Sequence, residues 1–539
     1  MRDHIYLLFA SMFRRTVRRA FAGMLAGLPF AVLASVPGWD LATGVFAEDA
    51  VGQDDFLSVV IELDTLSVSS RSPRLSIGSR QNGVTPVLLD GQVVMHVHDA
   101  SGAPVIDASF PPGLRPGIVL TGSLSHGITL SSRTDFRLVL DGLHIASSDG
   151  PALNIQSERR AFVQLNGRNQ LSDSPTWTAR TGPDGKPMDM KATLFSEGPL
   201  VITGNGSLDI VASTRHALAS DAHIRLSGGS LSIRADKRDG IRTHNAFVMD
   251  GGTLRIDATA GKGIKVDGKE HATTPLGFIA INAGVLAITS HDKAITASWE
   301  SAEDGKTPEL SDDPDPRVTI NGGQLSITTT GTPMASAEGS LSPEGIEAKS
   351  VLTVNGGDIT VRTADDGLNA GRHVAINGGR IFVRSTANDA VDSNGTLSIS
   401  GGLLVAHGAG RREGGLDCDA NTFAVTGGTF IGLGGRNSRV TPSATTQNTL
   451  VLGALDAGLL VIADEAGRVA FAYELPEAVG AVVLGSPELK RDAYVILRGG
   501  SLAGQGERFH GLYVGARGHR AGTDVARFRI DSSVTHASW

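Results

Sequence analysis

Charged and polar side chains recur at matching positions in eight four-residue segments of the chain. The segments are "HALA" (216–219), "DGIR" (239–242), "KGIK" (262–265), "KAIT" (293–296), "EGIE" (344–347), "DGLN" (366–369), "DAVD" (389–392) and "GGLD" (414–417). The second residue is always Gly or Ala, and the third is Ile, Leu or Val. The apolar third residue is expected to point inward, so the first and fourth side chains face solvent. If the segments stack, these side chains form one continuous strip.

The predicted strip changes charge along its length. Its earlier half carries basic candidates for ligand binding, which are Arg242, Lys262, Lys265 and Lys293. Its later half carries oxygen donors that are candidate metal ligands, namely Glu344, Glu347, Asp366, Asn369, Asp389, Asp392, Asp417 and Asp419. An alternative is that the lysines only aid solubility and the acids are solvated turn residues.

Calcium is the ion that suits the acidic half. Neighbouring strands lie about 4.8 Å apart, so stacked carboxylates repel one another unless solvent or a cation intervenes. Calcium accepts six to eight oxygen ligands in loose geometry. Zinc or copper would need a cluster of His or Cys, whereas the chain has one cysteine, Cys418, and scattered histidines.

A repeated unit is expected to position these segments. "VTINGGQLSI" (318–327) returns as "LTVNGGDITV" (352–361), "VAINGGRIFV" (374–383) and "LSISGGLLVA" (397–406). Each unit predicts a strand, a glycine turn, a second strand, a polar corner and a short third strand. Asn321, Asn355 and Asn377 before the glycines tolerate left-handed conformations. The residues expected to stack in one inward file are Ile224, Val248, Ile320, Val354, Ile376 and Ile399.

Such units bury an apolar column only by stacking on their neighbours. The predicted fold class is therefore all-β, a right-handed parallel β-helix, a solenoid of about 22 residues per coil, with a small C-terminal β-domain or cap. The predicted boundaries are 1–47 for a signal peptide, 48–115 for an irregular N-terminal β-containing region, 116–436 for the β-helix and 437–539 for the C-terminal β-domain.

The first 47 residues predict export. "FRRTVRR" (13–19) is a basic segment, "AFAGMLAGLPFAVLASV" (20–36) an apolar one, and "VFA" before Glu48 suits a signal peptidase. We expect a secreted, periplasmic or cell-surface protein without a stable membrane span after signal removal; a single membrane anchor is the alternative. The formal net charge of -8 makes nucleic acid an unsuitable partner.

The chain resembles the secreted carbohydrate-binding β-helix family of clostridial type, whose members bind calcium, cellulose and acidic polysaccharides. The resemblance rests on "LVLDGLHIASSDGPALNI" (138–155), "LFSEGPLVITGNGSLDI" (194–210), "SPELKRDAYVILRGG" (486–500) and "GLYVGARGHRAGTDVARFRI" (511–530). It implies calcium roles for Asp239, Asp366 and Asp389. His216, Lys262, Lys293 and Gly414 stand where the family's motif has Asp, which puts ion sites in those segments in doubt.

The resemblance implies a calcium-dependent protein that binds acidic or cellulosic polysaccharide and is more a binder than an enzyme. The family also resembles the β-helical pectate lyases, in which a lysine abstracts a ring proton. Lys262 and Lys265, if adjacent, could lower one another's pKa toward that task. A polysaccharide lyase is therefore one alternative, and a structural or adhesive surface protein is another.

Overall fold

The computed structural model describes most of the chain after the predicted signal. The described residues are 39–40, 45–46, 49, 56–99, 103–182, 185–268, 277–299, 316–336, 339–410, 413–420, 422–435 and 441–537. Nearly all of the predicted signal peptide, 1–47, lies outside them. No helix in these ranges is long and apolar enough to cross a membrane.

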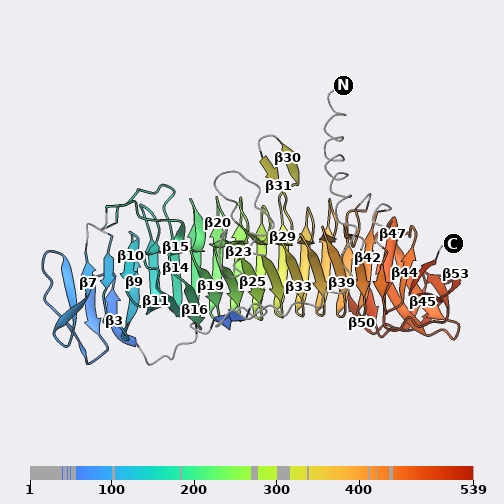
Figure 1. The fold of residues 1–539 in the computed structure, drawn as a ribbon, viewed down its shortest axis with the longest axis horizontal. Helices are drawn as coiled ribbons and strands as arrows, with labels where there is room; N and C mark the ends of the chain where they lie inside the picture. The colour runs from blue at the N-terminus through green and yellow to red at the C-terminus, as the bar shows by residue number, and fades with distance from the viewer. Residues whose placement is uncertain are drawn as a thin grey trace, which may run out of the picture.

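The described chain is built from β-strands that stand side by side along an elongated molecule (Figure 1). One fourteen-stranded sheet forms one side. Its strands are β5 (Leu75–Ile77), β6 (Val84–Leu89), β7 (Gln92–His98), β8 (Val105–Ala108), β10 (Ile128–Ser132), β12 (Leu153–Ile155), β15 (Ala192–Ser196), β18 (His216–Ser220), β21 (Ile241–Thr243), β24 (Ile264–Gly268), β27 (Ile295–Trp299), β32 (Ile346–Ala348), β35 (Leu368–Ala370) and β38 (Val391–Ser393).

A larger, closed sheet holds most of the other strands. Its strands up to residue 290 are β3 (Phe56–Glu62), β4 (Ser67–Ser70), β9 (Arg115–Leu124), β11 (Phe136–Ala146), β13 (Ala161–Asn166), β14 (Arg168–Ser172), β16 (Leu200–Gly204), β17 (Ser207–Ala212), β19 (His223–Leu226), β20 (Ser230–Ala235), β22 (Ala246–Met249), β23 (Thr253–Ala258), β25 (Phe278–Ile281) and β26 (Val285–Ser290). The later ones are β28 (Arg317–Ile320), β29 (Gln324–Thr329), β33 (Val351–Val354), β34 (Asp358–Thr363), β36 (His373–Ile376), β37 (Arg380–Ser385), β39 (Thr396–Ile399), β40 (Leu403–His407), β41 (Phe423–Val425), β42 (Thr429–Gly434), β43 (Ala444–Thr445), β44 (Thr449–Leu452), β47 (Ala481–Gly485) and β54 (Val534–Ala537).

The C-terminal part adds a six-stranded antiparallel sheet. Its strands are β45 (Gly458–Asp464), β46 (Val469–Leu475), β48 (Ala493–Arg498), β50 (Glu507–Phe509), β51 (Leu512–Val514) and β53 (Thr523–Arg529). Three two-stranded sheets complete the description: β1 (Trp39–Asp40) with β2 (Val45–Phe46), β30 (Met334–Ser336) with β31 (Gly339–Leu341), and β49 (Ser501–Gly504) with β52 (Arg517–Arg520).

The all-β class was predicted, but the predicted right-handed parallel β-helix is wrong as a description of the sheet topology. The main sheet is closed and barrel-like, and it mixes strand orientations. Parallel pairs such as β20–β23 share it with antiparallel pairs such as β3–β4, β42–β47 and β44–β47. The repeat in the sequence reports only the local strand and turn pattern, so it does not determine how the sheet closes at its ends.

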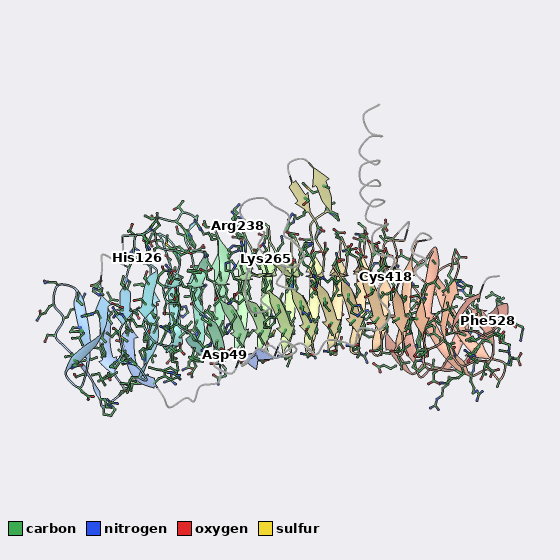
Figure 2. All side chains as sticks on the ribbon, viewed as in Figure 1. Asp49, His126, Arg238, Lys265, Cys418 and Phe528 are labelled. Atoms are coloured by element: carbon green, nitrogen blue, oxygen red, sulfur yellow. The ribbon has the colours of Figure 1, made fainter. Side chains whose placement is uncertain are left out.

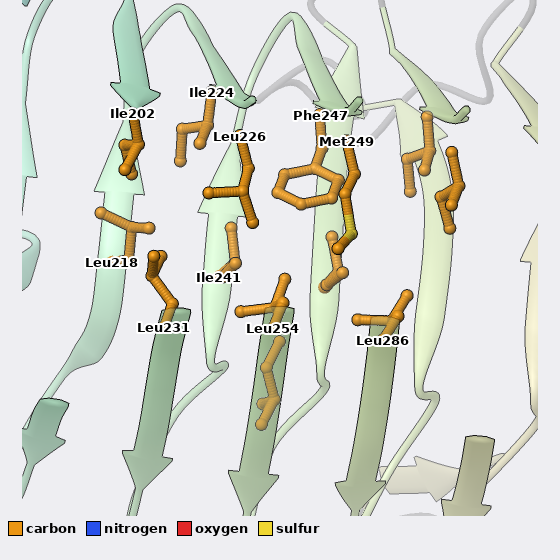
Figure 3. Packing of buried hydrophobic residues seen from close by; sticks show 14 of the residues in the cluster. Ile202, Leu218, Ile224, Leu226, Leu231, Ile241, Phe247, Met249, Leu254 and Leu286 are labelled. Atoms are coloured by element: carbon orange, nitrogen blue, oxygen red, sulfur yellow. The ribbon is translucent and has the colours of Figure 1, made fainter. Parts of the chain in front are cut away.

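The predicted inward file also needs correction. Ile320, Val354, Ile376 and Ile399 do share one register with Ile281, and all are buried. Ile224, however, pairs with Phe247, so its file is the neighbouring one (Figure 3). Val248 points the other way and packs in a separate cluster with Ala246, Phe278 and Ala280. Side chains alternate along a strand, so a shift of one residue reverses the face.

The glycine turns confirm one expectation and correct another. The second glycine of each pair is left-handed, with φ of +95° at Gly323 and +100° at Gly357. The preceding asparagines are not left-handed. Their amides instead form a ladder, in which Asn355 donates to Asn321 at 2.8 Å and Asn377 donates to Asn355 at 2.9 Å.

Candidate functional site

The outward face of the fourteen-stranded sheet brings the fourth residues of the corner segments into one file. Their backbone partners run in the order Ala219, Arg242, Lys265, Thr296, Glu347, Asn369 and Asp392. The third residues between them, such as Ile264 and Leu368, are completely buried. The fold therefore aligns the predicted basic and acidic residues on one strip.

A cavity opens at the basic end of this strip, and we call it the basic pocket. It has a volume of about 710 Å³ and is lined by Lys191, Thr214, Arg215, His216, Ala219, Ser220, Asp221, Arg238, Arg242 and His244. Of these, only Arg242 was a predicted ligand-binding residue. Figure 2 shows Arg238 and Lys265 near each other on one long side of the molecule, opposite Asp49.

Two exposed arginines give the basic pocket its unbalanced charge. Arg215 and Arg238 each precede the first residue of a corner segment, so adjacent strands place them at the same level. Among the described residues neither forms a salt bridge. The guanidinium of Arg215 lies 5.2 Å from the ring centre of the half-buried Trp177, in the loop before β15. A sequence search one position ahead of each corner segment would have found both arginines.

The other cations near the pocket lie in ion pairs. Arg242 and Lys265 share the carboxylate of Asp267, at 3.0 and 2.9 Å. Burial favours a raised pKa for Asp267, but Lys265, the Ser298 hydroxyl and Arg242 together hold its pKa below the ordinary value. Two cations and one anion leave a net positive charge at this point.

Lys191 contacts Asp221 at 2.7 Å and Asp189 at 2.9 Å. Burial opposes its charge, yet the two carboxylates raise its pKa above the ordinary value. Burial also lowers the pKa of His216 to about 4. The negative charge of Asp239 opposes this shift, and the positive charge of Arg242 adds to it. The imidazole is therefore neutral at neutral pH.

The other two predicted lysines lie in ion pairs. Lys262 pairs with Asp292, and Lys293 lies 2.5 Å from Glu344 and 3.3 Å from Glu347. Glu347 also accepts a hydrogen bond from the Thr296 hydroxyl at 2.6 Å. Lysines held in ion pairs are poorly suited to the proton abstraction that a lyase requires.

Glu344 and Glu347 respond differently to this environment. Burial raises the pKa of Glu344, and the charge of Glu347 adds to that effect, although Lys293 opposes it. Burial also acts on Glu347, but Lys293 and Lys349 outweigh it and lower its pKa. The middle of the strip is therefore a buried ion-pair network rather than a row of free carboxylates.

The acidic end of the strip does contain carboxylates without cations. We call Asp366, Asp389 and Asp392 the acidic cluster; no salt bridge joins them to a lysine or arginine within the described ranges. Burial and the charge of Asp392 raise the pKa of Asp366 to about 9. Burial and the charge of Asp417 raise the pKa of Asp389 and of Asp392 to about 7.

Polar contacts at this end come mainly from amides. Asn369 donates to Glu344 at 3.2 Å and to Asp366 at 3.4 Å. The backbone N–H of Asp389 donates to Asp366 at 3.1 Å, and that of Cys418 donates to Asp417 at 2.8 Å. Asp419 follows on the same backbone, where its N–H donates to the carbonyl of Ser393 at 2.9 Å.

The donor chemistry of the acidic cluster suits calcium, because carboxylate and amide oxygens are the ligands that it prefers. The arrangement of these side chains supports calcium less well than their chemistry does. Across the described ranges, no three or more His, Cys, Asp or Glu side chains converge as a metal site would require. Calcium therefore stays a prediction.

No curated protein matches the chain. A solved structure described as the polysaccharide lyase-like protein from C. thermocellum, a gadolinium derivative, matches with a TM-score of 0.34 and 20% identity, over 54% of this chain and 99% of that chain. A match at this level assigns no function to the chain.

The family comparison is more extensive. The model for carbohydrate-binding domain-containing proteins matches residues 116–390, slightly more than half of the chain. The matched segment includes the basic pocket and the strip as far as Asp389. The chain therefore belongs to the family of carbohydrate-binding domain-containing proteins.

Proposed function

We propose that the protein binds an acidic polysaccharide through the strip, with the basic pocket as the main contact. The observation that carries this proposal is the pair Arg215 and Arg238, which stand exposed beside the 710 Å³ cavity without a carboxylate partner in the described chain. A guanidinium binds a carboxylate with two parallel hydrogen bonds. A uronate or sulfated sugar supplies such a group.

Other features of the basic pocket support a sugar rather than a simple anion. Trp177 offers an aromatic ring beside Arg215. Thr214 also lines the pocket, and its hydroxyl, which donates to the carbonyl of Ser174, can still accept a hydrogen bond. A pocket that combines a few polar groups with apolar surface is typical of ligand sites. Positive charge at the basic end of the strip also attracts an anionic chain despite the overall charge of -8.

A sedimentation assay against insoluble polysaccharides tests this function. Wild-type protein is expected to be retained on polygalacturonate, and Arg215→Ala with Arg238→Ala is expected to lose at least tenfold in affinity. Arg168→Ala removes an exposed arginine of β14, outside the strip, and serves as the matched control. Equal retention of all three proteins would contradict the proposal, and a rise in ultraviolet absorbance during incubation would indicate lyase activity instead.

We further propose that calcium occupies the acidic cluster and adds a positive charge to the strip. An ion that binds only the folded state stabilises it by about 2.7 kcal/mol at a hundredfold excess over Kd. Chelator should therefore lower the Tm of the wild type, and Asp389→Ala with Asp392→Ala should remove that effect. An unchanged Tm together with no calcium in the purified protein would contradict the calcium site.

Export is proposed from the composition of residues 1–47. N-terminal sequencing of protein from its native host is expected to begin after this segment, outside the cytoplasm. A retained Met1 in a cytoplasmic protein would contradict export.

A further inference from the structure

We propose a second glycan site, on the closed sheet, in a trough that the C-terminal hairpin β50–β51 completes. The trough consists of three adjoining hollows with volumes of about 380, 560 and 490 Å³. The first two share Arg255, Ala287 and Ser326, and the last two share His510. This site lies on a different sheet from the basic pocket and has only the ligand class in common with it.

Strand register gives the trough its direction. Arg255, Ala287, Ser326, Thr360 and Phe382 are consecutive partners on β23, β26, β29, β34 and β37. Four strand spacings separate the first from the last, roughly 19 Å. An extended chain lying across the strands fits this floor better than a compact ligand does.

The tip of the C-terminal hairpin lies between the central hollow and the last one, because His510 lines both. His510 and Gly511 form the two-residue loop between β50 and β51, and both have positive φ, 44° and 93°. This turn places the His510 ring on Phe382, with centroids 3.9 Å apart and planes 11° from parallel. The family model matches residues 116–390, so His510 lies outside the matched segment.

Side-chain chemistry indicates an anionic sugar chain. Arg255 and Arg362 both line the central hollow, and neither has a salt bridge to another described residue, whereas the one carboxylate in its lining, Asp358, lies 3.7 Å from Arg380. The guanidinium of Arg362 lies 5.3 Å from the ring centre of Phe382, on which the His510 ring also stacks. Ser326, Thr360 and the Gln324 amide are available for sugar hydroxyls between the two cations. A linear oligosaccharide with carboxylate or sulfate groups matches this arrangement.

Calorimetric titration with oligogalacturonate tests the site in protein that already carries Arg215→Ala and Arg238→Ala. This parent is expected to retain one binding event. Adding Arg255→Ala and Arg362→Ala should weaken it at least tenfold, whereas adding Arg168→Ala should leave it unchanged. His510→Gly, which tolerates the positive φ of the turn, should weaken it at least threefold. A melt of each variant checks that it folds.

The outcomes separate the two sites. If the parent does not bind, or if the Arg255 and Arg362 substitutions leave its affinity unchanged, the trough site is overturned. If wild type and parent bind with equal stoichiometry while the trough substitutions abolish binding, the trough is supported and the basic pocket is contradicted.

Discussion

The acidic cluster shows how burial and charge act on single residues. Glu347 keeps a lowered pKa because two lysines accompany it, whereas Asp366 has only other carboxylates and amides as neighbours. In the absence of a cation, a pKa of about 9 leaves Asp366 protonated at neutral pH. The cluster therefore links the stability of the fold to protons or to a bound ion.

Removing one carboxyl should change how stability depends on pH. The folded pKa of Asp366 is raised from 3.8 to about 9, so its contribution to stability is full below pH 4 and is lost as the pH rises to 9. In chelator, Asp366→Asn should melt roughly 2 °C or more above wild type at pH 9 and close to it at pH 4. Asp531→Asn, at an exposed position, is the control; a variant that tracks wild type at both pH values would refute the raised pKa.

A second prediction for individual side chains concerns the asparagine ladder. Asn355 both donates to Asn321 and accepts from Asn377. Each net hydrogen bond contributes about 1 kcal/mol, and less when exposed. Asn355→Ala should lower the free energy of unfolding by about 1 kcal/mol in denaturant titrations. A double-mutant cycle with Asn377→Ala should show coupling between the two sites; strictly additive effects would mean that the ladder adds no stability.

At the scale of strands, the apolar files hold the two sheets together. Val354 is fully buried between Ile320 and Ile376 in its file, whereas the adjacent Thr353 faces the other way and is half-buried. Val354→Asp would place an unpaired charge in the core and should cost about 3 kcal/mol or more. Thr353→Asp should cost much less. Similar unfolding midpoints for both variants would contradict the register.

Sequence periodicity predicted these strands well, but it did not predict how the sheet that they form closes. Alternation of apolar residues identified the strands on both sides of Gly357 and the corner before Leu368, because burial on one face imposes that pattern locally. The antiparallel pairing of β42 with β47 connects residues far apart in the sequence, so no local pattern reports it. Phe247, Val248 and Met249 are all apolar, so alternation is ambiguous there, and the predicted file took Val248 where the register has Met249.

The candidate site was predictable in outline only. Corner spacing placed Arg242 and Lys265 on one strip, as the register has them. It missed Trp177, which a loop brings beside Arg215, and Lys191, which directly precedes β15 in register with Arg215. It also treated Lys293 and Glu344 as separate sites, although they form an ion pair.

At the scale of the whole molecule, the two proposed binding sites lie on separate faces. The basic pocket opens on the fourteen-stranded sheet, and the trough lies on the closed sheet beside the C-terminal hairpin. Two sites on one elongated body allow a single polysaccharide to be held at both, and linked binding raises the overall affinity well above that of either site. Loss of one site should therefore weaken binding to long polysaccharide more than binding to short oligosaccharide.

Hydrogen exchange in the presence and absence of oligogalacturonate tests the central claim most directly, because it locates the bound glycan. Bound oligogalacturonate is expected to slow exchange in residues 213–215 and 236–239, the loops that carry Arg215 and Arg238 at the basic pocket. The same measurement on Arg215→Ala with Arg238→Ala should lose that protection while the core strands remain protected. Binding accompanied by no change in these two loops would contradict the assignment of the pocket as a glycan site.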